Sequence, residues 1–463
     1  MADGVTGRRR WWALGMVSAA QLLVVLDGTI VNIALPSAQH ELGMSDGARQ
    51  WVITAYALAF GGLLLIGGRV SGQLGHRRAF IVGLVGFAVS SALGGAAASP
   101  GTLFAARALQ GVFAALLAPA GLSLLATTFT RPEERGRAFG VFAAVGAAGS
   151  AVGLVAGGLL TEYASWRWCL YVNAPVALLA AAGVVLVPRQ APARGEGRLD
   201  VTGALLSATG FVAVVYAFNR AESAGWGSPL VLALLGAGVA LLAGFAAVEA
   251  RAPHPLLPPR LLRHRARAGA FATIGLTFVA MFGCYLFMTY YLQTTLGYSP
   301  IQAGLVLLVH AAAAVVGSML IAGRLHGRVP PWAVIVPGLV ASAAGVFVLT
   351  RLTPLSTGIL PLYLTPAMLL TGIGMGCVIS PTASLATTGV HGHDTGAASA
   401  TYNAAQQLGA ALGTALFNTI ATSTAATSTA VHGYTTALTA AFAILLAAAL
   451  VATVFRTVPE RKH

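Results

Sequence analysis

Long apolar stretches follow one another along almost the whole chain, and short polar segments separate them. A helix that spans a membrane needs about 20 predominantly apolar residues. Because the runs are continuous rather than alternating, they indicate helices and argue against a β-barrel. We therefore predict an all-α polytopic membrane protein with 14 transmembrane helices, at residues 11–35, 50–70, 79–98, 101–125, 138–160, 168–187, 201–219, 229–248, 268–292, 301–322, 332–350, 359–381, 396–420 and 434–455.

The composition agrees with this class. Of the 463 residues 57% are hydrophobic and 9% are charged, whereas a soluble domain carries about 25% charged residues. The mean hydropathy is +0.79. The three cysteines, Cys169, Cys284 and Cys377, are far apart and show neither disulfide nor metal spacing, so we expect them to pack as small apolar residues. The first apolar run is too long for a signal peptide, and we expect it to be retained.

The arginines predict the orientation of the chain. If the N-terminus is cytoplasmic and the spans alternate, 22 of the 27 basic residues lie inside, four lie outside and Arg107 lies within a span. This asymmetry follows the positive-inside rule. We therefore expect a multi-pass protein of the cytoplasmic membrane with both termini in the cytoplasm. The net charge of +14 then reflects orientation beside anionic lipid rather than nucleic-acid binding.

Two polar breaks, at 188–200 and 249–267, divide the chain. They predict an N-terminal six-helix bundle at 1–188 and a C-terminal six-helix bundle at 267–463. Residues 189–266 would then hold two inserted helices and a basic amphipathic segment on the membrane surface. A short internal repeat supports two related halves: Gly68-Arg69-Val70 is echoed by Gly323-Arg324-Leu325. Paired repeats with a site between them are typical of secondary transporters.

Asp27 is the one acid that the pattern places deep in a span. Its burial costs roughly 2.5–3.5 kcal/mol on insertion scales, so we expect it to be functional. It lies roughly 13 Å below Pro36, and Arg107 lies roughly 10 Å below Pro100, at 1.5 Å per residue. The matching depths predict that the two side chains meet. We expect a proton-coupling pair; a static ion pair that joins the two helices is the alternative.

Several other side chains are candidates for a substrate cavity. Gln110 shares a helix face with Arg107, and the span 268–292 is dense in methionine and aromatic residues that suit lipophilic ligands or, alternatively, pack against lipid. A lone histidine inside a span, His310, is a candidate for handling substrate or protons. The expected cavity residues are Asn32, Tyr56, Gln110, Tyr285, Met288, Gln293, His310 and Asn403.

Glycines and loop arginines are candidates for gating. Gly149, Gly153 and Gly157, with Gly158 beside them, form a small-residue stripe that allows close helix packing. We further expect this stripe to hold the two halves together on the outer side. The loop 68–78 and the loop 130–137 could exchange charge pairs that lock one conformation, although exposed pairs contribute only about 0–1 kcal/mol each. The loop residues in this set are Gly68, Gly75, Arg77 and Arg78.

Motifs for other chemistry are weak or missing. The glycine-rich segment 372–376 lies inside a span with no strand before it, so packing explains it. His391, His393 and Asp394 fit a solvated loop better than a metal site. The sequence has no Walker loop, nucleophile elbow or zinc spacing. We expect neither an enzyme nor a metal or cofactor, and the energy source would be a proton gradient.

These motifs together resemble a known family. The stretch from Leu26 to Pro36 is similar to the first-helix signature of the drug:proton antiporter-2 family, the fourteen-span branch of the major facilitator superfamily. The resemblance extends over most of the chain, through the loop 68–78, Arg107 to Gly111, Gly149 to Gly158, Ser165 to Trp168, Asn173, Pro175 and Gln407 to Gly409. It implies two six-helix bundles around a central cavity that is lined by the first and fourth spans, and proton-driven export of lipophilic compounds.

Two positions depart from the family pattern. Gly72 stands where the loop motif has an acid, so a gating charge pair is missing or is supplied by Glu133 or Glu134. Leu154 stands where the antiporter motif has a proline, so the bend that this proline gives is expected to be absent.

The predicted function is a proton-coupled antiporter that exports lipophilic or amphipathic small molecules, such as antibiotics, by alternating access. A transporter of the same fold for one metabolite is the alternative, and a membrane enzyme or sensor lacks support from any catalytic constellation. The expected partners are a lipophilic substrate, protons and the bilayer, and we expect a monomer. A single deep acid favours neutral, monocationic or zwitterionic substrates over dications.

Overall fold

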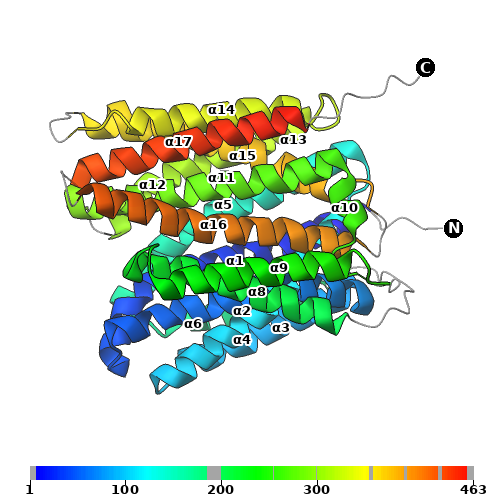
Figure 1. The fold of residues 1–463 in the computed structure, drawn as a ribbon, viewed down its shortest axis with the longest axis horizontal. Helices are drawn as coiled ribbons and strands as arrows, with labels where there is room; N and C mark the ends of the chain where they lie inside the picture. The colour runs from blue at the N-terminus through cyan, green and yellow to red at the C-terminus, as the bar shows by residue number, and fades with distance from the viewer. Residues whose placement is uncertain are drawn as a thin grey trace.

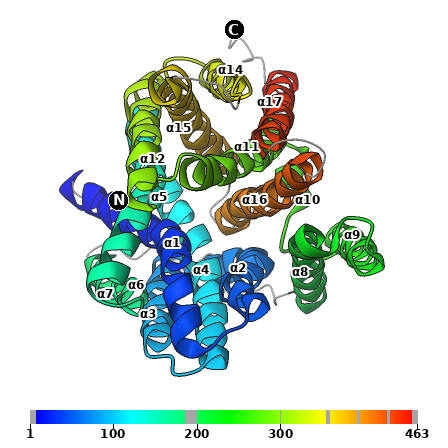
Figure 2. The ribbon, with the colours of Figure 1, turned by 90° about the vertical axis from the view of Figure 1, so that its left-hand side faces the viewer.

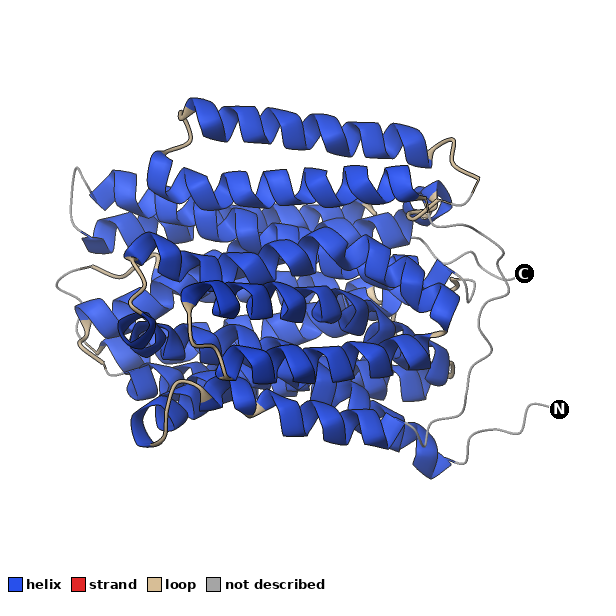
Figure 3. Cartoon of the chain, turned by 90° about the horizontal axis from the view of Figure 1, so that it is seen from below, coloured by secondary structure: helices blue, strands red, loops and turns tan. Residues whose placement is uncertain are grey.

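The computed structural model describes residues 7–184, 200–253, 255–298, 300–353, 358–390, 394–425 and 430–455. Within these ranges the regular structure is helical, and an isolated bridge between His326 and Val329 is its only extended pairing (Figure 3). The helices of the N-terminal half are α1 (Gly7–Leu42), α2 (Asp46–Leu74), α3 (His76–Gly95), α4 (Pro100–Thr128), α5 (Pro132–Tyr163), α6 (Trp168–Tyr171) and α7 (Asn173–Val184).

The remaining helices continue in the same manner. Three of the segments are π-helical turns, labelled η, which the periodicity of the sequence did not predict. The list comprises α8 (Val201–Ala224), α9 (Pro229–Glu249), α10 (Pro259–Arg263), α11 (Arg265–Tyr290), η1 (Tyr291–Thr295), α12 (Pro300–Val315), η2 (Val316–Ala322), α13 (Gly323–Leu325), α14 (Trp332–Leu349), η3 (Leu360–Leu364), α15 (Thr365–Thr387), α16 (Thr395–Ala425) and α17 (Ala430–Val454).

Each predicted span overlaps one of these helices or a helix pair. Among the described residues, twelve helices are long and apolar enough to cross a membrane. The other two predicted spans correspond to α6 with α7, which together are short, and to α16, which is rich in Ala, Thr and Gln. Fourteen membrane crossings therefore stay a prediction. Pro36 does not end the first helix as expected, because α1 continues to Leu42.

The helices run roughly side by side and form two groups (Figures 1 and 2). In Figure 2, α1 to α4, α6 and α7 lie below, α11, α12 and α14 to α17 lie above, and α5 lies next to α12 between the two groups. Helices α8 and α9 sit at one side, with α8 next to α2 and α16. Trp226, which follows α8, donates a hydrogen bond to Thr419 of α16 at 2.7 Å and fastens this pair to the C-terminal half. The domain boundaries remain a prediction, since residues 185–199 lie outside the described ranges.

One end of the molecule holds the starts of α1, α5 and α11 and the ends of α4, α15 and α17; we call it the terminal face and the opposite end the distal face (Figure 1). Ion pairing between Arg10 of α1 and Glu134 of α5, at 3.3 Å, places two of these helix starts together. By the arginine distribution, the terminal face is the expected cytoplasmic side.

The short internal repeat marks two equivalent contacts between the halves. A Cβ atom added to Gly68 of α2 would lie 2.5 Å from the carbonyl oxygen of Gly396 in α16. A Cβ atom on Gly136 of α5 would lie 3.0 Å from the carbonyl oxygen of Gly323 in α13. Glycine is therefore needed at both crossings, because the helix backbones touch there. The two halves meet at the terminal face through a pair of similar contacts.

Candidate functional site

The deepest polar cluster of the N-terminal half centres on Asp27. Arg107 of α4 donates a hydrogen bond from Nη1 to Asp27 Oδ2 at 2.6 Å and completes an ion pair. The other carboxylate oxygen accepts from Gln110 Nε2 at 3.2 Å and from Asn173 Nδ2 at 2.9 Å. Helices α1, α4 and α7 therefore converge on one carboxylate, and the contact expected from the matching depths is present.

The guanidinium of Arg107 is held on its other sides as well. Its Nε donates to the carbonyl oxygen of Val52 in α2 at 3.1 Å, and Nη1 also donates to Gln110 Oε1 at 2.9 Å. Its carbon Cζ lies 4.5 Å from the centre of the Tyr56 ring, a cation–π contact. Arg107 and Gln110 share a face of α4, as their spacing of three residues predicts.

Ser91 of α3 closes the cluster. Its hydroxyl donates to the carbonyl oxygen of Leu170 at 2.8 Å and accepts from Gln110 Nε2 at 2.9 Å and Asn173 Nδ2 at 3.2 Å. We call Asp27, Ser91, Arg107, Gln110 and Asn173 the carboxylate network. The first four spans and α7 thus contribute to a single connected site.

The carboxylate network is dry, which sets its chemistry. Asp27 is 0% exposed and Arg107 is 1% exposed. In such surroundings a charge is costly unless it is paired and hydrogen-bonded, and removing one partner of a buried pair typically costs about 3–5 kcal/mol. Loss of the negative charge of Asp27 would leave the Arg107 guanidinium buried without its counterion.

One buried oxygen of the network has no partner among the described residues. Asn173 is 0% exposed, and its Oδ1 accepts no hydrogen bond there. Buried polar atoms are rarely left in this state, and a water molecule or an alternative proton position commonly explains them. The network therefore has one acceptor free beside the carboxylate.

Two members of the network were not chosen from the sequence. Ser91 lies in an apolar span in which a small hydroxyl residue carries little signal. Asn173 entered only through the family resemblance and without a role. A polar side chain at the same depth as Asp27 is the signal that could have found both, but the order of helices around Asp27 would also be needed.

The remaining expected cavity residues do not join this site. Asn32 is exposed on α1, and Met288 of α11 is buried. Gln293 lies half-buried in the π-helical turn η1. Asn403 of α16 donates to the carbonyl oxygen of Ser399 on its own helix at 2.8 Å. Their role in a substrate cavity stays a prediction.

A second buried cluster lies in the C-terminal half. His310 of α12 contacts Tyr285 of α11 through Nε2 and the phenol oxygen, and its Nδ1 lies 3.1 Å from Thr371 Oγ1 of α15. Thr371 donates its hydroxyl to the carbonyl oxygen of Ala367 at 2.7 Å. The threonine oxygen therefore accepts from Nδ1–H, and the phenol donates to Nε2. We call Tyr285, His310 and Thr371 the histidine chain.

The glycine stripe of α5 packs against α1. A Cβ atom on Gly149 would lie 3.2 Å from the Val25 side chain, and one on Gly157 would lie 3.1 Å from Ile30. The stripe therefore joins two helices of the same half, and the interpretation that it holds the two halves together is wrong. Next to the stripe, Leu154 faces Gly304 of α12. A Cβ atom added to Gly304 would lie 3.4 Å from the Cβ atom of Leu154. Gly158 is half-buried.

Arg135 of α5 joins the two halves through several hydrogen bonds to α15. Its Nε donates to Ser384 Oγ at 2.9 Å, and its Nη2 donates to Thr387 Oγ1 at 2.6 Å, both on α15. Its Nη1 donates to the carbonyl oxygen of Ala126 at the end of α4 at 3.0 Å. Arg135 is 8% exposed, so these charged bonds are shielded from water. They close the terminal face.

The loop residues expected to gate lie at this face too. Gly75 has a φ of +84° in the turn between α2 and α3, a conformation that favours glycine. Arg77 donates to the carbonyl oxygen of Val184 at 3.1 Å, and Arg78 is exposed. Glu134 pairs with Arg10, as described, so a substitute for the missing acid at Gly72 is available in α5 but is engaged with α1.

The polar loop after α15 has its own contact. Asp394 pairs with Arg260 of α10 at 2.7 Å, which fastens the amphipathic segment to the start of α16. His391 and His393 lie outside the described residues.

Known proteins share both the sequence and the fold. Residues 17–414 match the family model described as Major Facilitator Superfamily. The puromycin resistance protein pur8 of Streptomyces alboniger is 56% identical over 457 residues, 96% of this chain and 91% of that protein. The cephamycin export protein CmcT of Amycolatopsis lactamdurans is 39% identical over 408 residues, 87% of this chain and 83% of that protein.

A solved structure gives the same fold at low identity. The human organic anion transporter MFSD10 superposes with a TM-score of 0.68 at 14% identity, over 96% of this chain and 99% of that one. Together with the helical architecture, the family match and the two relatives identify this chain as a membrane transporter, not an enzyme, that belongs to the major facilitator superfamily.

Proposed function

We propose that this chain is a proton-coupled antiporter that exports an amphipathic antibiotic across the cytoplasmic membrane. The observation that carries the proposal is the buried pair of Asp27 and Arg107, with three further network side chains around it. A transporter needs no buried ion pair to bind a lipophilic compound, and burying these two charges is costly. A reversible proton site explains why the chain keeps it.

In this proposal Asp27 takes up a proton from the distal side and gives it up at the terminal side. Proton binding cancels the carboxylate charge, so Arg107 must rely on Gln110, Val52 and the Tyr56 ring. The resulting change in helix contacts would favour opening of the terminal face, where Arg135 joins the two halves. Substrate leaves when the distal side is open, and the two events alternate.

The relatives suggest the class of substrate. The most extensive similarity described above is to a protein named for puromycin resistance, and others are named for cephamycin export and as a probable actinorhodin transporter. We therefore propose puromycin-like amphipathic antibiotics as the substrate class. Since three relatives carry the names of individual compounds, export of one dedicated metabolite is the second candidate.

The test uses purified protein in liposomes loaded with a pH-sensitive dye. Puromycin added to the wild-type protein should move protons across the membrane, and a pH gradient should drive puromycin transport. Asp27→Asn keeps the size of the side chain but cannot bind a proton, so both signals should fall to the level of empty liposomes. Glu162→Gln, at an exposed position of α5, is the matched control and should transport normally.

Two outcomes would overturn parts of this proposal. Normal pH-driven transport by Asp27→Asn would remove proton coupling from the carboxylate network. No proton movement with puromycin, but movement with another antibiotic, would favour the dedicated exporter; a panel of antibiotics in a pump-deficient host would identify that compound.

A further inference from the structure

A small pocket lies directly on the distal side of the carboxylate network. Val31 is one helical turn beyond Asp27, and Leu103 is one turn before Arg107 on a helix of opposite direction. Two further lining residues touch the network through their backbones: Val52 accepts from Arg107, and Leu170 accepts from Ser91. The network therefore lies directly behind the apolar lining of this pocket.

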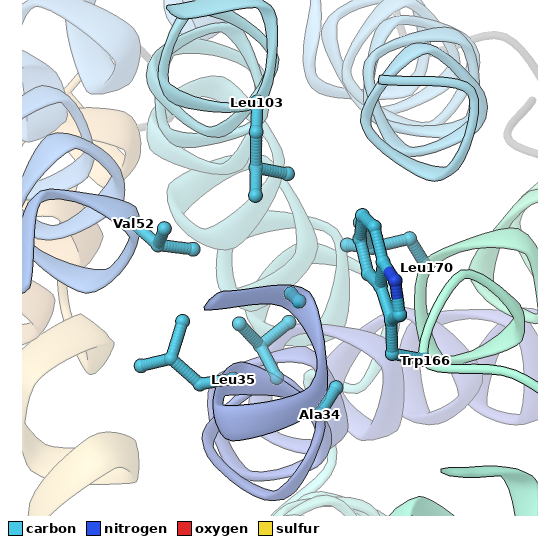
Figure 4. Close-up of a pocket in the computed structure, with 8 residues that line it drawn as sticks. Ala34, Leu35, Val52, Leu103, Trp166 and Leu170 are labelled. Carbon is cyan, nitrogen blue, oxygen red and sulfur yellow. The ribbon is translucent and has the colours of Figure 1, made fainter. Parts of the chain in front are cut away.

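The pocket walls are apolar. Figure 4 shows Leu35, Val52, Leu103 and Trp166 around a common space. The pocket has a volume of about 10 Å³, close to the least space that holds one water molecule and far below the roughly 300–1,000 Å³ of small-molecule sites. Its walls also lack the convergent polar groups that orient a drug. The complete set of lining residues is Val31, Ala34, Leu35, Ala38, Val52, Leu103, Trp166 and Leu170.

The chemistry of the carboxylate network differs from that of the adjacent pocket. The unpartnered oxygen of Asn173 lies in the network, where Asn173 also donates to Asp27. A water molecule is held only where several polar groups are available to bond it. The carboxylate network offers such groups, and the lining of the pocket does not. An apolar passage of this kind can switch between dry and wet states with small changes in width.

The distal rim of the pocket is fastened by hydrogen bonds. Trp166 donates from its indole nitrogen to Glu41 at 2.7 Å. Arg167 donates to the same carboxylate at 2.8 Å and to the carbonyl oxygens of Gly95 and Ala97 at 2.8 and 2.7 Å. The side chain of Glu41 is 49% exposed. The rim therefore places a solvent-accessible carboxylate next to the indole that walls the pocket.

We propose that this pocket is a hydrophobic gate for water, through which protons from the distal side reach Asp27 inside the N-terminal half. It rests on the proposed function, since it requires that Asp27 binds protons. Substrate, by contrast, would use the expected route between the halves. The two cargoes then reach the transporter by separate paths, and Asn173 Oδ1 offers the incoming water an acceptor within the network.

The first test fills the pocket. Ala34→Leu adds three carbons to a wall residue that is 3% exposed. We expect pH-driven puromycin transport in liposomes to fall at least about tenfold because the water path is blocked. Exchange of labelled for unlabelled puromycin needs no net proton movement and should stay within about twofold of wild type. Ala240→Leu, on the exposed face of α9, is the control and should change neither.

The second test wets the pocket. Leu103→Ser places a hydroxyl in the wall, and we expect protons to leak into liposomes in the absence of puromycin, several times faster than with wild type. Adding Asp27→Asn to this variant should abolish the leak if protons pass through the carboxylate. Because Leu103→Ser is expected to produce a proton leak rather than a loss of activity, it tests the gate even if Ala34→Leu does not fold.

The outcomes separate this inference from the proposed function. Wild-type protein that moves no protons with any substrate contradicts the proposed function. Wild-type coupling that persists in Ala34→Leu, or the absence of a leak in folded Leu103→Ser, overturns the gate alone. Equal loss of transport and exchange in Ala34→Leu also overturns it, because the pocket would then serve the substrate.

Discussion

The two halves of the transporter hold different chemistry at equivalent helix crossings. In the N-terminal half, a Cβ atom on Gly111 of α4 would approach the carbonyl oxygen of Tyr56 in α2 to less than 3.0 Å. In the C-terminal half, a Cβ atom on Gly372 of α15 would likewise lie less than 3.0 Å from the carbonyl oxygen of His310 in α12. The residue before each glycine, Gln110 or Thr371, belongs to the buried cluster of its half.

The difference lies in charge. The carboxylate network contains a full ion pair, whereas the histidine chain is satisfied by a neutral imidazole between a phenol and a hydroxyl. A neutral, fully bonded chain specifies how three helices pack and needs no partner from solvent. An ion pair whose acid can be neutralised responds to protons. Under the proposed function, energy coupling would lie in the N-terminal half, and the histidine chain would be its packing counterpart in the C-terminal half.

The largest expected effect is on folding stability when one charge is removed. Arg107→Gln leaves Asp27 buried without its counterion and should lower the free energy of unfolding by about 3–5 kcal/mol. His310→Gln removes a neutral hydrogen-bonding ring and should cost only about 1–3 kcal/mol. Thermal unfolding in detergent at pH 7.5 measures both. A greater loss in His310→Gln would reverse the assignment of the two clusters.

The next effect concerns the two equivalent helix crossings, one within each half. Gly111→Ala and Gly372→Ala each push a methyl group against a backbone carbonyl and should destabilise by similar amounts, about 1–3 kcal/mol. Gly28→Ala is the control, because nothing lies within 4 Å of a Cβ atom there, and it should be neutral or slightly stabilising. Unequal losses at Gly111 and Gly372 would show that the crossings are not equivalent.

The next effect concerns the contact between the two halves at the terminal face. Arg135→Ala removes the bonds to Ser384 and Thr387, and one charged hydrogen bond contributes about 1.5–3 kcal/mol. The equilibrium between closed and open terminal faces should therefore shift about tenfold or more toward open. Arg137→Ala, an exposed neighbour on the same helix, should not shift it.

Spin labels measure this shift. Labels at the exposed positions Glu133 and Arg328 report the distance between the halves at the terminal face, because the native cysteines in the described ranges are buried. Unchanged distances in Arg135→Ala would mean that the close backbone contacts of Gly68 and Gly136 are enough to hold the terminal face closed.

The smallest effect is a pH dependence at the same face. Burial, and then the charge of Arg135, lower the pKa of His326, which lies in the turn after α13 beside Gly136. Its folded pKa is below the unfolded value of about 6.5. The contact is therefore fully stable above pH 6.5 and loses stability as the pH falls below it.

The label distance reports this effect between pH 8 and pH 5. We expect a modest shift toward the open terminal face in acid, smaller than that of Arg135→Ala. His326→Gln should show a flat response over the same range. A wild-type response that matches His326→Gln would assign no role to this histidine.

The sequence predicted the helices well because their signal is local. Apolar runs of membrane length and the arginines between them require no knowledge of neighbours. The depth argument also brought Asp27 and Arg107 to the same level, because depth follows from the rise per residue. One assumption behind these depths was wrong, namely that the first helix ends at Pro36, since α1 continues to Leu42.

Neighbours around each helix were harder to predict. The glycine stripe of α5 was recognised as a packing surface, but its partner is α1 and not the other half. Asn173, which donates to Asp27, and Ser91, which accepts from Asn173, were missed for the same reason. Periodicity tells which residues share a face, but it does not say which helix covers that face.

The opening pattern of apolar and polar positions therefore determined the class of protein, its helices and the one deep acid. Only the tertiary structure decided that four other side chains join that acid in the carboxylate network. It also decided that an apolar pocket lies beyond the acid and that the other half holds a neutral cluster at the matching crossing. The physical reason is that a bilayer fixes position along a helix axis, whereas close packing among many helices fixes rotation and partner.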